Sequence, residues 1–458
     1  MKIRNSLFFA ILLVLLCSAR VEAQTVTALP PAETAVVGRF ARGPIDLPRR
    51  VTASEFDALF GSTTPASYPA ELQVRQFFAN GGAALHVVRI SPEGALAQAL
   101  LGRADELTGL HALTVASDVR LLVAPELSMV GAGEFPALLG SFRAFLEPRR
   151  IFLLLDPPPG LASVSAAVAW VQASVPVNAS SCAIYFPYLQ VATSSGTVQA
   201  PASGSMAAVF GRNATWVSPA GTSFPISAAG VSQGLTTAEI DALATNHINP
   251  VRLLSGQVVP WSARTLDRED AEKRFIVVPR TVLWVAASVE RSLAFAAIAD
   301  NAEPLWAQIR SGVAGFLHGL YQQGAFAGST PTASYFVRCD PSTTTPADQQ
   351  AHRVNVLYGM ALLRASEFYI NVVTGVTFDP QRVVEVPVLR LRAEGGELFL
   401  PFPTLAGFGY QLASRPALGS GTWNAVGVPV NGDGSWQRPV LPQSGGSGFF
   451  RVEISSRR

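Results

Sequence analysis

Residues 303–324 encode the clearest single element of the chain, EPLWAQIRSGVAGFLHGLYQQG. Apolar residues recur through this stretch at the spacing of one helix face, and they are Leu305, Trp306, Ile309, Val313, Phe316, Leu317 and Leu320. Gly324 follows where helices commonly end in a left-handed residue, a conformation that glycine adopts without a steric penalty. The pattern predicts an amphipathic helix over 303–323, within the longest run of agreeing local signals, 259–369.

Shorter signals lie on both sides of this helix. Before it come ARTL at 263–266 and FIVVPR at 275–280, and the second segment predicts a β-strand because it is rich in β-branched residues. After it come YFVRCD at 335–340, a polar turn at 341–348, and an apolar segment that leads to the pair EF at 367–368. Helix, strand and turn signals therefore alternate along 259–369.

In their order and spacing, these segments together with GAF at 324–326 resemble the C-terminal core of contractile phage tail sheath proteins and their relatives in contractile injection systems. Pieces nearer the start of the chain resemble the N-terminal part of the same family: GP at 43–44, FG at 60–61, NGG at 80–82 and VR at 88–89. The middle of the chain continues the likeness. The resemblance runs over 35–369, which is most of the sequence.

The resemblance implies a structural subunit and no enzyme. Such subunits form homo-oligomers that stack in sixfold rings around a tail tube, contact a baseplate, and shift collectively from an extended to a contracted array. N- and C-terminal arms add strands to neighbouring subunits, which is a form of β-augmentation. The resemblance also implies that an α/β middle domain faces outward as decoration, and that no cofactor is needed.

The first 23 residues have the pattern of a signal peptide. Lys2 and Arg4 form a basic start, 7–16 is an apolar stretch too short to span a bilayer comfortably, and VEA at 21–23 is a small-residue cleavage site. The mature chain is predicted to begin at Gln24, without an integral membrane span, in the periplasm or outside the cell. Sheath proteins are instead virion components or cytoplasmic.

Composition describes a well-buried globular protein with no signal for nucleic acid. Hydrophobic residues make up 49% of the chain and charged residues 14%, and the net charge is only +2. No basic run interleaved with aromatic residues is present, so nucleic acid is not an expected partner. The length predicts two or three domains at about 100–200 residues each.

Strands and helices alternate through the first half of the mature chain. Strands are predicted near 35–41, 85–90, 121–125 and 151–156, and helices begin with the capping pair Thr52 and Glu55 and recur at 70–80, 135–146 and 164–173. The two strands at 121–125 and 151–156 are continuous apolar runs, which is typical of a sheet covered on both faces. This alternation predicts an α/β layer.

The last part changes character. From 386 onward, short β-like runs alternate with glycine and proline, and NGDG at 431–434 is a turn signal. The predicted fold is therefore multidomain, α/β and α+β, with a small all-β domain at the C-terminus. The predicted division is as follows: signal peptide 1–23, N-terminal part of a sheath-like core 24–90, α/β middle domain 91–258, C-terminal part of the core 259–375, and β-sandwich-like domain 386–458.

Few residues suggest chemistry. GVSQG at 230–234 matches a nucleophile-elbow pattern around Ser232, but that motif needs a buried strand directly before it and a helix directly after it. The expected helix starts only near Thr237, so Ser232 is interpreted as a loop serine. Asp156 ends an apolar strand, where α/β proteins place functional carboxylates, yet the prolines at 157–159 favour a turn.

No catalytic, cofactor-binding or metal-binding residue is therefore assigned. The five histidines show no ligand spacing, and His318 is predicted to be a packed or rim residue of the main helix. After the signal peptide only Cys182 and Cys339 remain, so far apart that separate buried thiols are favoured over a disulfide.

Two other functions stay open at this point. The signal peptide and the extra β domain suggest an exported, non-contractile surface or matrix protein whose β domain binds a polymer. A secreted hydrolase that uses Ser232 is the third and weakest hypothesis. In addition, only 24–34 separates the cleavage site from the first strand, so one linking arm of the family is predicted to be missing or altered.

Overall fold

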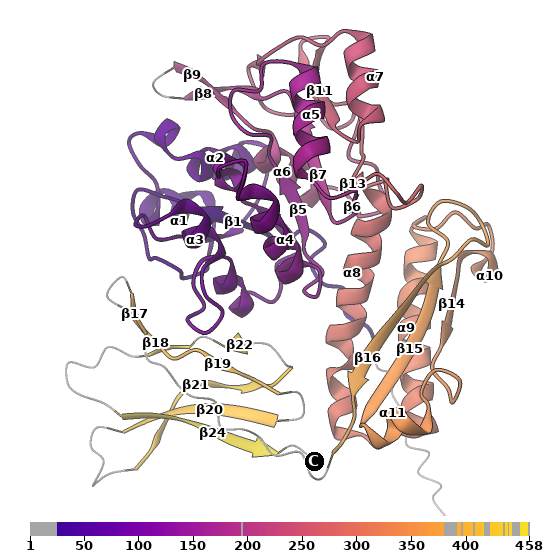
Figure 1. The fold of residues 1–458 in the computed structure, drawn as a ribbon. Helices are drawn as coiled ribbons and strands as arrows, with labels where there is room; N and C mark the ends of the chain where they lie inside the picture. Colours follow the sequence, from indigo (N-terminus) through magenta and orange to yellow (C-terminus); the bar gives the residue numbers. More distant parts are fainter. Residues whose placement is uncertain are drawn as a thin grey trace, which may run out of the picture.

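The structure is a computed structural model that describes residues 25–193, 196–379, 392–394, 397–405, 408–415, 422–433, 436–437, 439–441 and 449–456. The predicted signal peptide at 1–23 and the predicted start at Gln24 lie outside these residues. Figure 1 shows three parts: a large α/β part, a helix-and-sheet part beside the long helix α8, and a group of short strands from the end of the chain.

An eight-stranded sheet organises the α/β part. Its order is β12-β11-β7-β5-β4-β1-β3-β2. The strands are β1 (Thr34–Gly38), β2 (Arg49–Val51), β3 (Leu85–Arg89), β4 (Leu121–Val123), β5 (Phe152–Leu155), β7 (Cys182–Phe186), β11 (Asn249–Leu254) and β12 (Gln257–Pro260). The inner strands run parallel, and β2 and β12 close the two edges in antiparallel fashion.

Helices cover both faces of this sheet, as predicted for parallel strands that are apolar throughout. They are α1 (Ala53–Leu59), α2 (Pro69–Ala79), α3 (Leu96–Leu101), α4 (Phe135–Leu146), α5 (Val164–Ser174), α6 (Ser203–Gly211) and α7 (Thr237–Thr245). Residues of α3, α4, α5 and α7 pack into one core cluster, and residues of α1, α2 and α6 pack into another on the opposite face. The result is a three-layer sandwich, and the capping pair of α1, Thr52 and Glu55, is confirmed.

The large sheet crosses the predicted division between residues 90 and 91. Strand β1 lies between β3 and β4, with Val36 paired to Val87 on one side and to Val123 on the other. Strands of the predicted N-terminal core and of the predicted middle domain are therefore neighbours in one sheet. Local patterns predicted β1, β3 and β4 one by one, but strand order depends on contacts between residues far apart in sequence.

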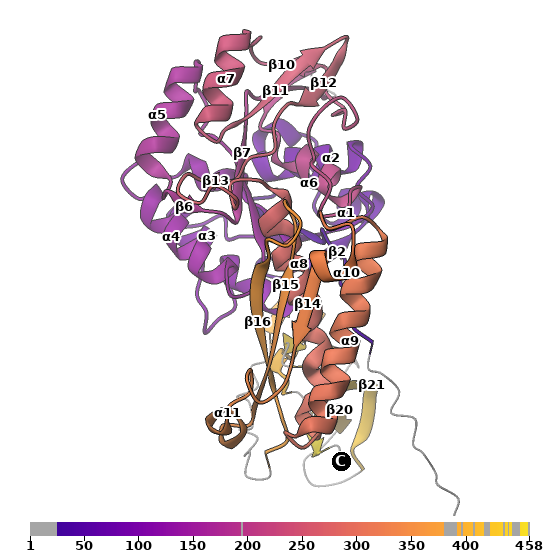
Figure 2. The same cartoon turned by 90° about the vertical axis from the view of Figure 1, so that its right-hand side faces the viewer.

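The second part contains two long helices and a three-stranded antiparallel sheet. Helices α8 (Val277–Ser292) and α9 (Glu303–Gln322) pack against β14 (Tyr335–Arg338), β15 (Arg353–Met360) and β16 (Tyr369–Val376) in one core cluster. Short helices α10 (Pro331–Ser334) and α11 (Pro346–Gln350) flank β14. Figure 2 shows this sheet and α9 side by side. The predicted helix over 303–323 is confirmed, and Gly324 ends it with a φ of 78°.

The predicted strand at 275–280 is wrong, because α8 begins at Val277. The buried residues Trp284, Val285 and Ser288 continue the helical spacing far beyond this short β-branched run. Packing of the whole helix face therefore overrides the local strand preference of a few residues. Helix α8 and the turn after it, Val277–Ile298, are together long and apolar enough to cross a membrane. However, 56% of the most apolar part of this segment is buried inside the protein, as in a core helix.

Short antiparallel strands make up the remaining sheets. Within the first 270 residues these are β6 (Asn178–Ala179), β8 (Leu189–Thr193), β9 (Gly196–Ala200), β10 (Gly230–Val231) and β13 (Leu266–Asp267). Towards the C-terminus they are β17 (Arg392–Glu394), β18 (Glu397–Phe399), β19 (Phe402–Pro403), β20 (Phe408–Arg415), β21 (Asn424–Asn431), β22 (Trp436–Gln437), β23 (Val440–Leu441) and β24 (Phe449–Ser456). The C-terminal strands form several small sheets, and their arrangement as a β-sandwich stays a prediction.

Two ion pairs connect these C-terminal strands to the rest of the chain. Arg49, the first residue of β2, pairs with Glu397, and Arg291 in the last turn of α8 pairs with Asp433 at 3.3 Å. The Arg49 guanidinium also lies over the ring of Phe399, 5.1 Å from its centroid. The C-terminal strands therefore dock on both the α/β part and α8.

Candidate functional site

One face of the β14–β15–β16 sheet is open to solvent. Along β16 the exposed fractions of Ile370, Val372 and Val376 are 63, 55 and 42%, whereas Val373 between them is buried. Because directly paired residues share a face, Leu357 of β15 lies beside Val372. We call these four exposed or half-exposed residues, Leu357, Ile370, Val372 and Val376, the open sheet face.

The same sheet also has two strand edges. Within the described residues, β14 and β16 each pair only with β15. An edge strand presents unpaired backbone N–H and C=O groups, which can accept a further strand from another chain. An apolar face next to a free edge is the arrangement in which strand addition also buries side chains.

A buried asparagine connects the two halves of the chain. Asn249, fully buried at the start of β11, donates to the carbonyl oxygens of Ile184 and Arg264 at 3.0 and 2.8 Å. Its own oxygen accepts from the Ser262 hydroxyl at 2.8 Å and from the Arg264 N–H at 2.6 Å. One amide group thereby fixes the path of the chain as it leaves the large sheet for α8.

Two buried carboxyl groups lie at the carboxyl ends of the parallel strands. Asp156 follows β5, is only 3% exposed, and accepts a hydrogen bond from the Ser203 hydroxyl at 2.7 Å. Glu126 follows β4, is equally buried, and accepts from the N–H of Arg39 at 3.1 Å. The sequence predicted only a turn at Asp156, but the structure buries its carboxyl group.

Burial raises the pKa of both groups. The pKa of Asp156 rises to about 7 because desolvation disfavours the carboxylate, and the charge of Glu126 adds to this effect. The pKa of Glu126 also rises to about 7, again chiefly by desolvation. The two groups lack the access to solvent that a catalytic pair requires, so we interpret them as buried structural acids.

Ser232 does not lie in a nucleophile elbow. The strand before it, β10, has only two residues, and α7 begins at Thr237. The backbone N–H of Ser232 donates to the carbonyl of Tyr188 at 2.8 Å, which fixes a loop beside β8. The interpretation as a loop serine agrees with this geometry.

The histidines differ in their surroundings. His318 is half-buried on α9, with its Nδ1 3.0 Å from the Tyr335 hydroxyl, in agreement with the predicted rim position. His86 was not singled out in the sequence, yet its Nε2 lies 3.4 Å from both Glu33 and Asp118. Arg50 already donates to Glu33 at 2.7 Å, so we interpret this cluster as a charge network.

Comparison with known proteins identifies the fold. No family model matches the sequence, and no curated protein matches it either. Among solved structures, the contracted sheath complex of an extracellular contractile injection system, PVC, matches with a TM-score of 0.60 and 23% identity, over 81% of this chain and 97% of that one. The chain has the fold of contractile sheath proteins. We refer to this architecture below as the sheath fold.

Further structures with the sheath fold extend the likeness. A six-fold symmetrised baseplate structure of the anti-feeding prophage contains a chain that matches with a TM-score of 0.56 and 21% identity, over 84% of this chain and 98% of that one. The sheath tail protein of Desulfitobacterium hafniense matches with a TM-score of 0.53 and 10% identity, over 77% and 97%. At such identities the likeness concerns the fold.

Several residues behind the sequence resemblance have structural roles within the sheath fold. Arg264 of the ARTL segment bonds to Asn249, and Gly324 ends α9. Phe336 packs edge-to-face on Phe368, with ring centroids 5.1 Å apart. It also lies so close to Gly359 that a Cβ there would come within 2.2 Å of the ring. Each of these contacts is made within the chain.

Proposed function

We propose that this protein is a structural subunit of a contractile sheath, which polymerises as stacked rings around a tail tube, and that it is not an enzyme. The observation that carries this proposal is the match to a contracted sheath complex over 97% of that chain. The match to a chain of a six-fold symmetrised baseplate structure supports sixfold rings and a baseplate as partner. Export by the signal peptide at 1–23 remains part of the proposal.

The open sheet face and its edges are the proposed contact between subunits. In this proposal an arm of a neighbouring subunit adds a strand to β16 or β14, and its side chains cover Val372 and Ile370. We retain the proposed domain limits, 24–90 and 259–375 for the core, 91–258 for the middle domain and 386–458 for the extra β domain. Roughly a fifth of this chain lies outside the match to the sheath complex, which supports an appended domain.

Electron microscopy of the mature chain from residue 24, with and without residues 386–458, tests the proposal. We expect rings or striated tubules from at least one of the two proteins. Tubules from the shortened protein alone would mean that the extra β domain limits polymerisation. Monodisperse monomers from both would contradict the proposed function.

Val372→Glu is expected to abolish assembly without unfolding the subunit. The side chain is 55% exposed, so the free energy of unfolding should change by only about 0.5 kcal/mol. A charge placed where an added strand must pack costs desolvation energy in the polymer only. Sedimentation velocity measures assembly, and urea unfolding measures stability.

Leu253→Glu is the matched control, because Leu253 is 51% exposed on β11, away from the open sheet face. It should leave both assembly and stability unchanged. If the two variants assemble equally well, the open sheet face is not the contact between subunits.

A second function, an exported surface or matrix protein without a lattice, is favoured by the N-terminal segment. Residues 25–33 form no strand, and Thr27 and Leu29 bond to α8 of their own subunit. The N–H of Leu29 donates to the Ser288 hydroxyl at 3.1 Å, and the Trp284 indole donates to the Leu29 carbonyl at 2.7 Å. This segment is thus engaged within its own chain, and monomers in the microscopy experiment would support this alternative. The loop geometry of Ser232 gives no support to a hydrolase.

A further inference from the structure

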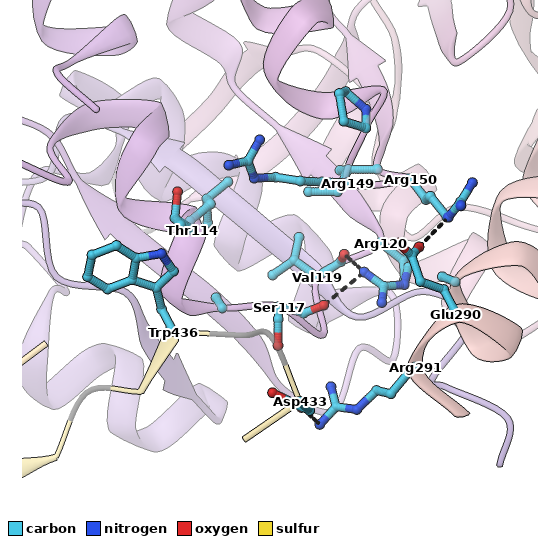
Figure 3. Close-up of a pocket in the computed structure, with 15 residues that line it drawn as sticks. Thr114, Ser117, Val119, Arg120, Arg149, Arg150, Glu290, Arg291, Asp433 and Trp436 are labelled. Atoms are coloured by element: carbon cyan, nitrogen blue, oxygen red, sulfur yellow. Dashed lines mark hydrogen bonds and ion pairs between the residues drawn. The ribbon is translucent and has the colours of Figure 1, made fainter. Parts of the chain in front are cut away.

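A pocket lies where the α/β part, helix α8 and the C-terminal strands meet (Figure 3). Its volume is about 470 Å³. Arg120 and Arg150 reach it from just before β4 and β5, Arg291 from the last turn of α8, and Trp436 from β22. Three separate regions of the chain therefore build its walls.

The walls carry more positive than negative charge. Arg149 joins the three arginines named above, so that four guanidinium groups line the pocket, against the two carboxylates of Glu290 and Asp433. Both carboxylates already have partners, since Glu290 bonds to Arg150 at 2.8 Å and Asp433 pairs with Arg291 at 3.3 Å. Among the described residues, Arg120 and Arg149 form no ion pair with either lining carboxylate, although the negative charge of Asp118, outside the lining, acts on Arg120.

Arg120 is held in place by its surroundings. Its side chain is only 8% exposed, and its Nη1 donates to the carbonyl oxygens of Ser117 and Val119 at 3.0 and 2.5 Å. Its Nε has no hydrogen-bond partner among the described residues. Burial lowers the pKa of Arg120 to about 10, so the group is still charged at neutral pH. The charge of Asp118 offsets part of this burial cost, but the unpaired Nε can still donate to a further anion.

Arg149 supplies a further positive charge. Its guanidinium stacks on the ring of Phe145, 3.8 Å from the centroid, and its Nη1 donates to the Phe145 carbonyl at 3.0 Å. Burial lowers its pKa. Stacking fixes the guanidinium plane, and a fixed fork of N–H donors matches the oxygens of a tetrahedral anion.

We propose that this pocket binds a small dianion, a phosphate or sulfate group, beside Arg120, with Arg149 and Arg291 on opposite sides of the pocket (Figure 3). Arginines outnumber carboxylates among the lining residues, which favours an anion with more than one negative charge. Trp436 on the wall offers an apolar surface for an organic group attached to that anion. The proposal does not depend on the sheath function, because the pocket is complete within one subunit.

Isothermal titration of the full mature chain with inorganic phosphate and with sulfate tests the site, with sodium chloride added to keep ionic strength constant. We expect saturable binding of both anions and none of acetate. Arg149→Gln and Arg291→Gln should each weaken phosphate binding about tenfold. The Arg291 side chain is 45% exposed, so its variant should fold, and circular dichroism verifies this for each protein.

Arg103→Gln is the control, because it removes the same charge from an exposed side chain outside the pocket that pairs with Asp105. Its phosphate affinity should equal that of the unmodified protein. Absence of saturable binding, or equal affinity in all three variants, would overturn the proposal.

Phenyl phosphate distinguishes the two sources of the anion. Binding tighter than that of inorganic phosphate, and lost in Trp436→Ala, would identify an organic ester as the ligand. Equal binding of the two compounds, unaffected by Trp436→Ala, would identify the free ion.

Discussion

Asn249→Ala should lower the free energy of unfolding by about 4 kcal/mol, since each buried polar group left without its partner costs about 1–3 kcal/mol. The substitution removes four hydrogen bonds of 2.6–3.0 Å at a fully buried position. The carbonyl oxygens of Ile184 and Arg264 would lose a side-chain donor, and the Ser262 hydroxyl and the Arg264 N–H would lose their acceptor. Urea unfolding followed by circular dichroism measures the effect as a shift of the midpoint.

Asn371→Ala is the matched control. Asn371 is half-buried in β16 and makes one long bond of 3.4 Å, to the Tyr369 carbonyl in its own strand. We expect a change within about 0.5 kcal/mol. A similar small change for Asn249→Ala would mean that other groups or water replace its bonds, and that Asn249 does not fix the connection between the two halves.

Asp156→Asn should stabilise the protein at pH 8 and leave it nearly unchanged at pH 4. The folded-state pKa of Asp156 is about 7, against an ordinary value of 3.8. As the pH rises from about 4 to about 7, the unfolded chain loses this proton first, so stability falls, and the full penalty is present above pH 7. The asparagine oxygen can still accept the Ser203 hydroxyl but never ionises. We expect a gain of about 2–4 kcal/mol at pH 8, since one pKa unit corresponds to about 1.4 kcal/mol.

Asp241→Asn makes the same chemical change at an exposed position on α7. It should have no effect beyond about 0.5 kcal/mol at either pH. Urea unfolding at pH 4 and pH 8 compares each of the two variants with the unmodified protein. A loss of stability for Asp156→Asn at pH 8 would mean that the ionised carboxylate is itself required by the fold.

Elements with strong local signals were predictable from the sequence. Helix α4 has both of its predicted ends, Phe135 and Leu146, and α9 ends at the expected glycine, because caps and apolar periodicity are properties of neighbouring residues. The start of helix α8 was mistaken for a strand, because the buried residues that decide it, Trp284, Val285 and Ser288, lie further along the helix. Strands β1 and β4 are neighbours in one sheet although they are far apart in sequence. No local sequence pattern indicates such a pairing.

Only single residues of the candidate sites were predictable from the sequence, without the partners that they contact. Asp156 was noticed as a carboxylate at a strand end, but its partners Ser203 and Glu126 come from other elements. Asn249 carries no motif, and its importance arises from four bonds that exist only in the folded chain. The arginine pocket is built from three regions that are far apart in sequence. Its excess of positive charge therefore becomes apparent only in the folded chain.

The N-terminal segment on α8 has a mechanical consequence. The backbone passes between the α/β part and the helix-and-sheet part twice, once after Leu29 as it leaves α8 for β1, and once over 261–276 as it leaves β12 for α8. Two parts joined by two covalent connections cannot swivel freely. Any rotation of one part against the other must leave both connections unstretched, which restricts the joint more than a single linker would.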